Sequence, residues 1–332
     1  MSAFATESFD AQAYADNRVT YPRELYDYVL DHTTRRGPPR DPDLTRPSSK
    51  TVCLDLGCGP GLATFEFAPH FDETVGVEPG QGMVDVANDL RQRSSTSLAT
   101  KTVRFARGSA ERLDDVGIEP ETVDLAVACT AAHWFDPVPT WHQLATVLKP
   151  GASFAFFTYS TLHFPTRPEL EALVVPFDRD VLGPYWTEPG HSRSWSLLAT
   201  FPFPDAASDG RIDAAFDPSS FERVYFLLSP DQDPPRPSIS TTSTTTTSQE
   251  NVKTTVERSL SPILSRSWTR TQVADLVRTW SACHSWNEAH RAEGRDCVQE
   301  WIEALTDAGW RDADERVDVA WEVGLMLGRK KG

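Results

Sequence analysis

The chain of 332 residues has few cysteines, only three methionines and no long apolar run. Its five cysteines are an odd number without C-x-x-C spacing, which indicates reduced thiols and argues against a zinc site. No apolar stretch approaches the roughly 20 residues that a membrane span requires, and residues 1–8 lack the basic and apolar regions of a signal peptide. We therefore expect a cytoplasmic protein that has no membrane partner and holds no metal.

Positive charge is also scarce, since 32 Lys and Arg residues stand against 48 Asp and Glu residues and give a net charge of −16. Such a surface repels polyanions, which argues against nucleic acid as a partner. A small anionic substrate needs only one basic pocket. The content of hydrophobic residues, 39%, is enough for a sizeable core. Length does not decide the number of domains, and we expect a monomer or a weak homodimer.

Strand-like and helix-like runs alternate in the first half of the chain, which predicts a parallel α/β sheet. Two later strand-like runs, at residues 221–228 and 316–327, bring the predicted count to seven. The fold class predicted is therefore α/β, a seven-stranded Rossmann-like sheet with a largely helical cap inserted after the fifth strand. The first five predicted strands are residues 52–56, 73–78, 103–106, 123–129 and 153–159.

Four parts of the chain are predicted. Residues 1–50 form an N-terminal helical lid with a Pro- and Arg-rich linker, and residues 51–160 form the core of the sheet. Residues 161–315 form the cap, which includes the sixth strand and a disordered Pro-, Ser- and Thr-rich loop at 231–252. Residues 316–332 complete the sheet. Within the cap, residues 269–285 and 296–308 are predicted helices.

A glycine loop, Asp55-Leu56-Gly57-Cys58-Gly59-Pro60-Gly61, joins the first strand to the following helix. Glycine lets the backbone approach a ligand closely, and the start of the helix offers free N–H groups. Glu78 ends the second strand roughly 20 residues later, where a ribose diol lies in a doubly wound sheet. Together they predict a nucleotide pocket. The third glycine comes one residue too early for the nicotinamide dinucleotide fingerprint.

Three aromatic clusters carry further candidate residues. Residues 129–136 follow the fourth strand, at the sheet edge where open α/β folds bind ligands. Residues 183–194 form a loop fixed by prolines and glycines, and residues 278–286 are helical. Packing of large rings is the alternative interpretation of each cluster. The side chains of interest are His133, Trp134, Tyr185, Trp186, Arg193, Arg278, Trp280 and His284.

These motifs together resemble the trans-aconitate methyltransferase family of class I S-adenosylmethionine (SAM) methyltransferases. The glycine loop resembles motif I of that class, and the later motifs are more specific. The resemblance covers residues 9–329, apart from the Thr-rich insertion. It rests on Tyr14-x-x-x-Arg18-x-x-Tyr21-Pro22, the glycine loop, Ala132-His133-Trp134-Phe135-Asp136, Gly183-Pro184-Tyr185-Trp186 with Pro189-Gly190 and Ser192-Arg193, and residues 277–282.

The resemblance implies SAM as the cofactor and O-methylation of a carboxylate on a small, often dicarboxylic, acid. Ser109 stands where many class I enzymes carry an acid. The resemblance implies that Asp55 and Gly57 hold the methionine end of SAM and Glu78 the ribose hydroxyls. It places Pro79 and Met83 on one adenine face and Ala110 and Glu111 at the adenine edge, and Tyr14, Arg18 and Tyr21 close over the methionine carboxylate. The other implied cofactor-binding residues are Gly59, Gly61, Ser109 and Cys129. The catalytic candidates are His133, Tyr185 and Arg193, and the substrate-binding candidates are Trp134, Trp186, Arg278, Trp280 and His284.

Methyl transfer from a sulfonium to a carboxylate is an in-line displacement, and the carboxylate is already ionised near neutral pH. Such a site must align the groups and exclude water, and it needs no base. We expect Arg193 or Arg278 to pair with a substrate carboxylate, because arginine offers a planar two-point fork. Two alternatives are a hydroxyl acceptor with His133 or His284 as base, and a SAM-binding protein that does not methylate.

Overall fold

The computed structural model describes residues 11–35, 50–93, 102–206, 210–228, 252–258 and 262–332. Most of the linker predicted before residue 50 and nearly all of the loop predicted at 231–252 lie outside the described residues. The predicted division of the chain into four parts stays a prediction.

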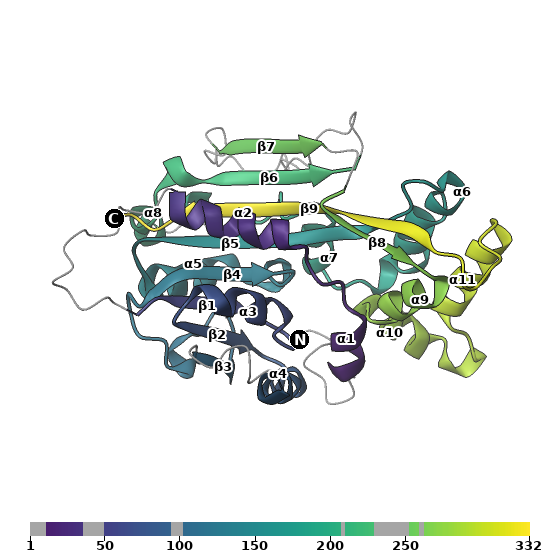
Figure 1. The fold of residues 1–332 in the computed structure, drawn as a ribbon, viewed down its shortest axis with the longest axis horizontal. Coiled ribbons are helices and arrows are strands. Elements are labelled where there is room, and N and C mark those ends of the chain that lie inside the picture. The colour runs from purple at the N-terminus through teal and green to yellow at the C-terminus, as the bar shows by residue number, and fades with distance from the viewer. Residues whose placement is uncertain (1–10, 36–49, 94–101, 207–209, 229–251, 259–261) are drawn as a thin grey trace.

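A single mixed sheet of nine strands runs through the described residues (Figure 1). The strand order is β3-β2-β1-β4-β5-β9-β6-β7, with β8 paired to β9. Strands β1 to β5 pair in parallel with one another, and β9 is antiparallel to β5, β6 and β8. The strands are β1 (Val52–Leu56), β2 (Glu73–Glu78), β3 (Thr102–Arg107), β4 (Val123–Cys129), β5 (Leu148–His163), β6 (Glu222–Leu227), β7 (Lys253–Arg258), β8 (Leu264–Trp268) and β9 (Val317–Arg329).

The predicted count of seven strands is wrong, because β7 and β8 belong to the same sheet. β7 pairs in parallel with β6 at the edge of the sheet, and β8 pairs with the first residues of β9. The sequence of β7, Lys-Thr-Thr-Val-Glu-Arg, has no apolar alternation. An edge strand is held by backbone hydrogen bonds on one side, so polar side chains do not prevent it from forming.

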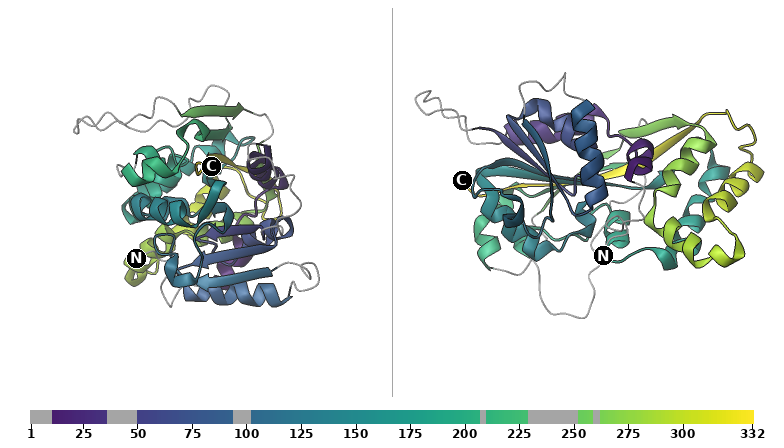
Figure 2. Two further views of the ribbon diagram at one scale, coloured as in Figure 1. Left: turned by 90° about the vertical axis from the view of Figure 1, so that its left-hand side faces the viewer. Right: turned by 90° about the horizontal axis from the view of Figure 1, so that it is seen from below.

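Helices cover both faces of the sheet, as the two views of Figure 2 show. α2 (Arg23–Arg35) and α3 (Leu62–Phe67) pack on one face with Cys53, and α5 (Pro137–Val147) and α8 (Gly210–Ala215) pack on the other with Leu54. All five residues of β1 are buried. A parallel strand with helices on both faces requires such an apolar run.

A second group of helices lies beyond the ends of β5, β8 and β9, at the right of Figure 1. The helix predicted at 269–285 is two helices, because the chain turns at Thr279 and Trp280. Thr279 Oγ1 donates a hydrogen bond to the carbonyl of Leu276, and Trp280 has an extended ψ of 133°. A hydroxyl that bonds its own helix backbone competes with helix continuation. The helices here are α6 (Pro168–Glu171), α9 (Arg270–Arg278), α10 (Ser281–Ala289) and α11 (Cys297–Asp307).

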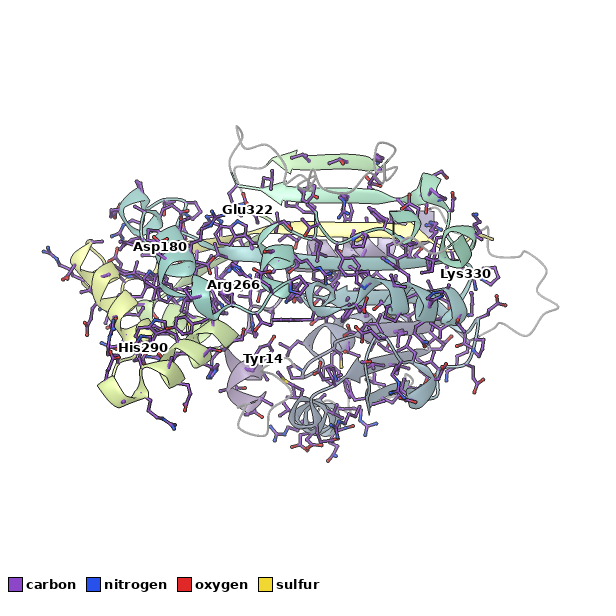
Figure 3. The ribbon with its side chains drawn as sticks, turned by 180° about the vertical axis from the view of Figure 1, so that it is seen from behind. Tyr14, Asp180, Arg266, His290, Glu322 and Lys330 are labelled. Carbon is purple, nitrogen blue, oxygen red and sulfur yellow. The ribbon has the colours of Figure 1, made fainter. Side chains whose placement is uncertain are left out.

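The short helix α1 (Ala11–Asn17) contacts α4 (Gln81–Arg93) on one side and α9 on the other. Tyr14, labelled in Figure 3, therefore lies between the sheet and the helical group. This position brings the N-terminal segment to the carboxyl ends of the parallel strands. Among the described helices, none combines the length and apolar character needed to cross a membrane.

Candidate active site

The glycine loop is packed at one glycine and open at the next. Gly57, Gly59 and Gly61 all have positive φ values of 66°, 54° and 84°, a region that costs other residues energy. A Cβ on Gly57 would lie 2.5 Å from the Cβ of Ala131, whereas a Cβ on Gly59 would meet no described atom within 4 Å. Gly57 N donates to the carbonyl of Val77 at 2.8 Å. The open side of the loop is therefore at Gly59.

Glu78 is buried beside this loop and is held by backbone amides. Its Oε2 accepts from Gly59 N at 3.1 Å, and its Oε1 accepts from Gly80 N at 2.9 Å. Burial raises the pKa of Glu78, while the two amide bonds oppose the rise. A carboxylate oxygen has more than one lone pair. Each oxygen of Glu78 can thus accept a further hydrogen bond, as a ribose hydroxyl would require.

Asp55 is fully buried, and only one of its two carboxylate oxygens has a hydrogen-bond partner among the described residues. Thr64 Oγ1 donates to Asp55 Oδ2 at 2.6 Å, whereas Oδ1 has no hydrogen-bond partner among the described residues. Burial raises the pKa of Asp55 to about 7. A buried carboxylate oxygen without a partner is costly. The ammonium group at the methionine end of SAM would satisfy it, so the residues present fit this cofactor.

The glycine-loop cavity, about 480 Å³, opens between the glycine loop and the N-terminal segment. Gly61 lies outside its lining, because a Cβ there would meet the Phe105 ring at 2.6 Å. The predicted SAM residues that line the cavity are Tyr14, Arg18, Tyr21, Asp55, Gly57, Gly59 and Cys129.

The residues assigned to adenine lie farther along the sheet edge, outside the lining of the glycine-loop cavity. Glu78 pairs with Arg107, so the ends of β2 and β3 lie side by side. Arg107 Nε donates a hydrogen bond to the carbonyl of Pro79 at 3.2 Å. Glu111 Oε1 accepts from Asp136 N at 3.0 Å. The remaining members of this group are buried Met83, half-buried Ser109 and buried Ala110.

The tryptophan cavity, about 730 Å³, adjoins the first and is lined by four tryptophans. The ring of Trp134 lies against Gly190, where a Cβ would approach it to 2.6 Å. This close approach requires glycine at the start of α7 (Gly190–Trp195). The four tryptophans are Trp134, Trp186, Trp195 and Trp280.

Four residues line both cavities and mark their junction, namely Tyr14, Arg18, Thr130 and Tyr159. Arg18 Nη1 donates to the hydroxyl of Tyr159 at 2.7 Å, and its guanidinium lies 4.5 Å from the centre of the Tyr14 ring. Arginine is always charged. The junction therefore carries a fixed positive charge, on a segment 141 residues away from Tyr159 in the sequence.

Thr130, at this junction, has an unusual backbone conformation. Its φ is 59°, which for a β-branched residue is an outlier that costs roughly 1–3 kcal/mol. Thr130 N donates to the carbonyl of Phe157 at 2.7 Å, and Tyr21 donates its hydroxyl to Thr130 Oγ1 at 2.8 Å. The sequence interpretation assigned no role to Thr130 or Tyr159. The position of Thr130, directly after β4, was the available signal.

His133 lines the tryptophan cavity and is neutral. Burial lowers its pKa to about 3, and the charges of Arg18 and Arg193 add to the effect. Its Nδ1 is buried without a hydrogen-bond partner among the described residues. A histidine with so low a pKa is a weak base near neutral pH. His133 can still donate or accept a hydrogen bond.

Arg193, a catalytic candidate, has its guanidinium directed at backbone carbonyls. Arg193 Nη1 donates to the carbonyls of Phe135 at 2.7 Å and His133 at 3.3 Å. Arg193 lies outside the lining of the tryptophan cavity. It ties α7 to the turn after β4 and so positions His133.

Three other candidates also lie outside this lining. Tyr185 packs against the ring of His290, and Arg278 is exposed and pairs with Asp275 at 3.3 Å. His284 is exposed on α10. The acceptor-side candidates that do line the cavity are His133, Trp134, Trp186 and Trp280.

Comparison with known proteins identifies the nucleotide-binding half. Residues 54–156 match the family described as a methyltransferase domain. A probable S-adenosylmethionine-dependent methyltransferase of Saccharomyces cerevisiae is 27% identical over 186 residues, which are 55% of this chain and 58% of that protein. An uncharacterized methyltransferase of Bacillus subtilis is 30% identical over 145 residues, 43% of this chain and 51% of that protein. The chain thus spans little more than half the length of these relatives.

A solved structure is similar over nearly the whole chain. The putative type II methyltransferase of Anaeromyxobacter dehalogenans superposes with a TM-score of 0.59 and 25% identity, covering 94% of this chain and 97% of that one. Its similarity extends past residue 156 into the helical group. Residues 54–156, which include the glycine loop, Asp55 and Glu78, are therefore similar to a SAM-dependent methyltransferase domain.

Proposed function

We propose that the protein transfers the methyl group of SAM to a carboxylate oxygen of a small organic acid, as its resemblance to the trans-aconitate methyltransferase family implies. The observation that carries this proposal is the charge at the junction of the two cavities. Arg18 provides a cation there, and His133 is neutral with a pKa of about 3. A junction that carries a cation, next to a histidine with so low a pKa, suits an acceptor that arrives ionised.

When bound, SAM supplies an activated methyl group on a sulfonium. The transfer would join the methyl carbon to a carboxylate oxygen and leave the electron pair of the broken carbon–sulfur bond on sulfur, so it would require no proton transfer by any residue of the chain. Arg18 lines both cavities, so it attracts and orients the acceptor carboxylate in addition to the methionine carboxylate that the resemblance assigns to it. The rings of Trp134 and Trp280 exclude water from the tryptophan cavity. Such positioning can supply roughly 7–11 kcal/mol of the barrier reduction.

A hydroxyl acceptor is supported less well, because it needs a base to remove its proton. His133 is ineffective in that role near neutral pH, given its pKa of about 3. His284, the second candidate base, is exposed and outside the tryptophan cavity. Neither of the two histidines considered as a base from the sequence fits that role, which favours a carboxylate.

The test uses the full chain, methyl-labelled SAM and a panel of small carboxylic acids. We expect methyl esters, detected by mass spectrometry, and a kcat at saturating SAM that is flat from pH 6 to 8. His133→Gln should leave this pH profile flat. Ether products, or a rate that falls as pH drops through about 6.5, would instead support the hydroxyl acceptor. Binding of S-adenosylhomocysteine without transfer to any acceptor would indicate a protein that does not methylate.

A further inference from the structure

We propose that Asp178 and His191 form a subsite that binds a hydrogen-bond-donating group of the acceptor, a hydroxyl or an ammonium. Both residues line the tryptophan cavity and not the glycine-loop cavity, so the subsite lies away from the methyl donor. The inference rests on the proposed function, in which the carboxylate of the acceptor lies at Arg18. It makes the acceptor an acid with a donor group at its other end, and not a dicarboxylic acid.

The geometry of Asp178 leaves one carboxylate oxygen without a partner. Asp178 is 2% exposed and sits in a π-helix, Pro176–Val181, a conformation that is frequent at functional sites. Trp186 Nε1 donates to Asp178 Oδ1 at 3.0 Å. Asp178 Oδ2 is buried and has no hydrogen-bond partner among the described residues.

His191 faces this oxygen across a gap. His191 Nε2 is 3.7 Å from Asp178 Oδ2, too far for a hydrogen bond, and it too is buried without a hydrogen-bond partner among the described residues. The imidazole stacks on the ring of Trp186, with centres 4.8 Å apart and planes 4° apart. Its Nδ1 lies 3.6 Å from Glu188 Oε1. The ring is therefore held in place with Nε2 available.

Asp178 Oδ2 and His191 Nε2 are together suited to bind a ligand group that donates a hydrogen bond. One hydroxyl oxygen can lie at about 2.8 Å from both atoms, donating to Asp178 Oδ2 and accepting from His191 Nε2. An ammonium can donate to Asp178 and, where His191 Nε2 is unprotonated, to the imidazole as well. A carboxylate has no proton to donate and is repelled by Asp178. Leaving both buried atoms unmatched is costly, which favours acceptors that satisfy them.

The charged residues that line the tryptophan cavity also favour an acid with a donor group at its other end. Histidines aside, Arg18 and Asp178 are its charged residues among the described lining, one of each sign. A dicarboxylic acid needs two cations, whereas a hydroxy or amino acid needs one cation and one acceptor. The second cation is missing from this lining because Arg193 bonds backbone carbonyls and Arg278 is exposed.

The experiment compares linear acids that differ only in their far end. The probes are ω-hydroxy, ω-amino, unsubstituted and dicarboxylic acids of four, six and eight carbons, for example 6-hydroxyhexanoate, 6-aminohexanoate, hexanoate and adipate. Binding is measured by quenching of tryptophan fluorescence with S-adenosylhomocysteine present, and methyl transfer by kcat/KM. At the best chain length we expect a hydroxy or amino acid to exceed the dicarboxylic acid by at least about tenfold in both measurements. The comparison of the hydroxyl and amino probes identifies the donor.

Asp178→Asn is the decisive variant, since its amide oxygen can still accept from Trp186 while the negative charge is lost. We expect it to lower kcat/KM for the preferred acid about tenfold and to raise it for the dicarboxylic acid. A purely structural role would lower both together. Asp180→Asn, at an exposed position in the same π-helix (labelled in Figure 3), is the matched control and should change neither.

The outcomes separate the subsite from the proposed function. A binding preference for donor-bearing acids without methyl esters would overturn the proposed function and keep the subsite. Methyl esters formed equally well from dicarboxylic acids, with a ratio that Asp178→Asn does not change, would overturn the subsite and keep the function. Failure of every probe to bind would overturn the subsite as well.

Discussion

The two cavities of this protein are built in different ways. The glycine-loop cavity is shaped largely by one continuous strand, loop and helix, in which backbone conformation and small residues matter most. The tryptophan cavity is shaped by large side chains from α1, the turn after β4, β5, the π-helix, α7 and the start of α10. The family match at 54–156 covers most of the residues that line the first and few of those that line the second. The predicted cofactor residues therefore come largely from a local segment, while the lining of the tryptophan cavity comes from segments far apart in the sequence.

A substitution of Arg18 should affect both cofactor and acceptor binding, because this residue lines both cavities. We expect Arg18→Met to weaken S-adenosylhomocysteine binding and to lower kcat/KM for the acid, each about 100-fold, the scale of losing one partner of a buried charge pair. Calorimetry and steady-state kinetics measure the two effects. Arg23→Met, at an exposed position on α2, is the control. A loss confined to one measurement would assign Arg18 to one cavity alone.

A matched pair of glycine variants tests how the glycine-loop cavity is packed. Both Gly57→Ala and Gly59→Ala carry the cost of a left-handed φ, but only Gly57→Ala also collides with Ala131. We expect Gly57→Ala to lower the free energy of unfolding by about 2 kcal/mol more than Gly59→Ala. Denaturant titration measures this difference.

Gly59→Ala, by contrast, should fold and bind S-adenosylhomocysteine more weakly, because its methyl group enters the open side of the loop. Equal stability of the two variants would contradict the described packing.

The raised pKa of Asp55 predicts that the affinity of the glycine-loop cavity for S-adenosylhomocysteine depends on pH. With a pKa of about 7, Asp55 is mostly protonated at pH 6 and mostly ionised at pH 8. The ligand ammonium binds the ionised form, so S-adenosylhomocysteine affinity should rise about tenfold between these two pH values. Calorimetry at both values checks this, and Asp55→Asn should bind weakly without the pH dependence.

The same group affects the stability of the unliganded protein with a defined sign. Because the pKa of Asp55 is raised above its usual value of 3.8, its contribution to stability is fully present below that value and is lost as pH rises through about 7. Thermal melts of the wild type and Asp55→Asn should therefore diverge across this window. Parallel melting curves would show that Asp55 is already ionised at low pH.

The smallest effects are expected for the two arginines first considered as substrate ligands. Arg193→Met removes bonds to two backbone carbonyls and should cost about 1 kcal/mol of unfolding free energy. Arg278→Met should change neither stability nor the KM for an acid by a measurable amount, since exposed pairs contribute little. Thermal melts and kinetics measure both. A raised KM in Arg278→Met would return this residue to the acceptor site.

Much of the parallel part of the sheet could be predicted from sequence. Strands β1, β2 and β4 have the predicted bounds, because buried parallel strands are apolar runs between turns. β7 and β8 could not be predicted, since edge pairing depends on neighbours and not on their own polar sequences. The prediction of a single helix at 269–285 is wrong, because the chain turns at Thr279, whose side chain donates a hydrogen bond to its own helix backbone. Of the eight acceptor-side candidates, four line the tryptophan cavity.

The sequence by itself determined the cofactor half, because a strand, a glycine loop and a carboxylate roughly 20 residues later are fixed by local chain geometry. Only the tertiary structure decided the acceptor half. It placed Arg18 against Tyr159, 141 residues away, at the junction of the two cavities. It also left Asp178 and His191 facing each other with unmatched atoms. Side-chain contacts over such separations depend on packing of the whole chain, which no local pattern encodes.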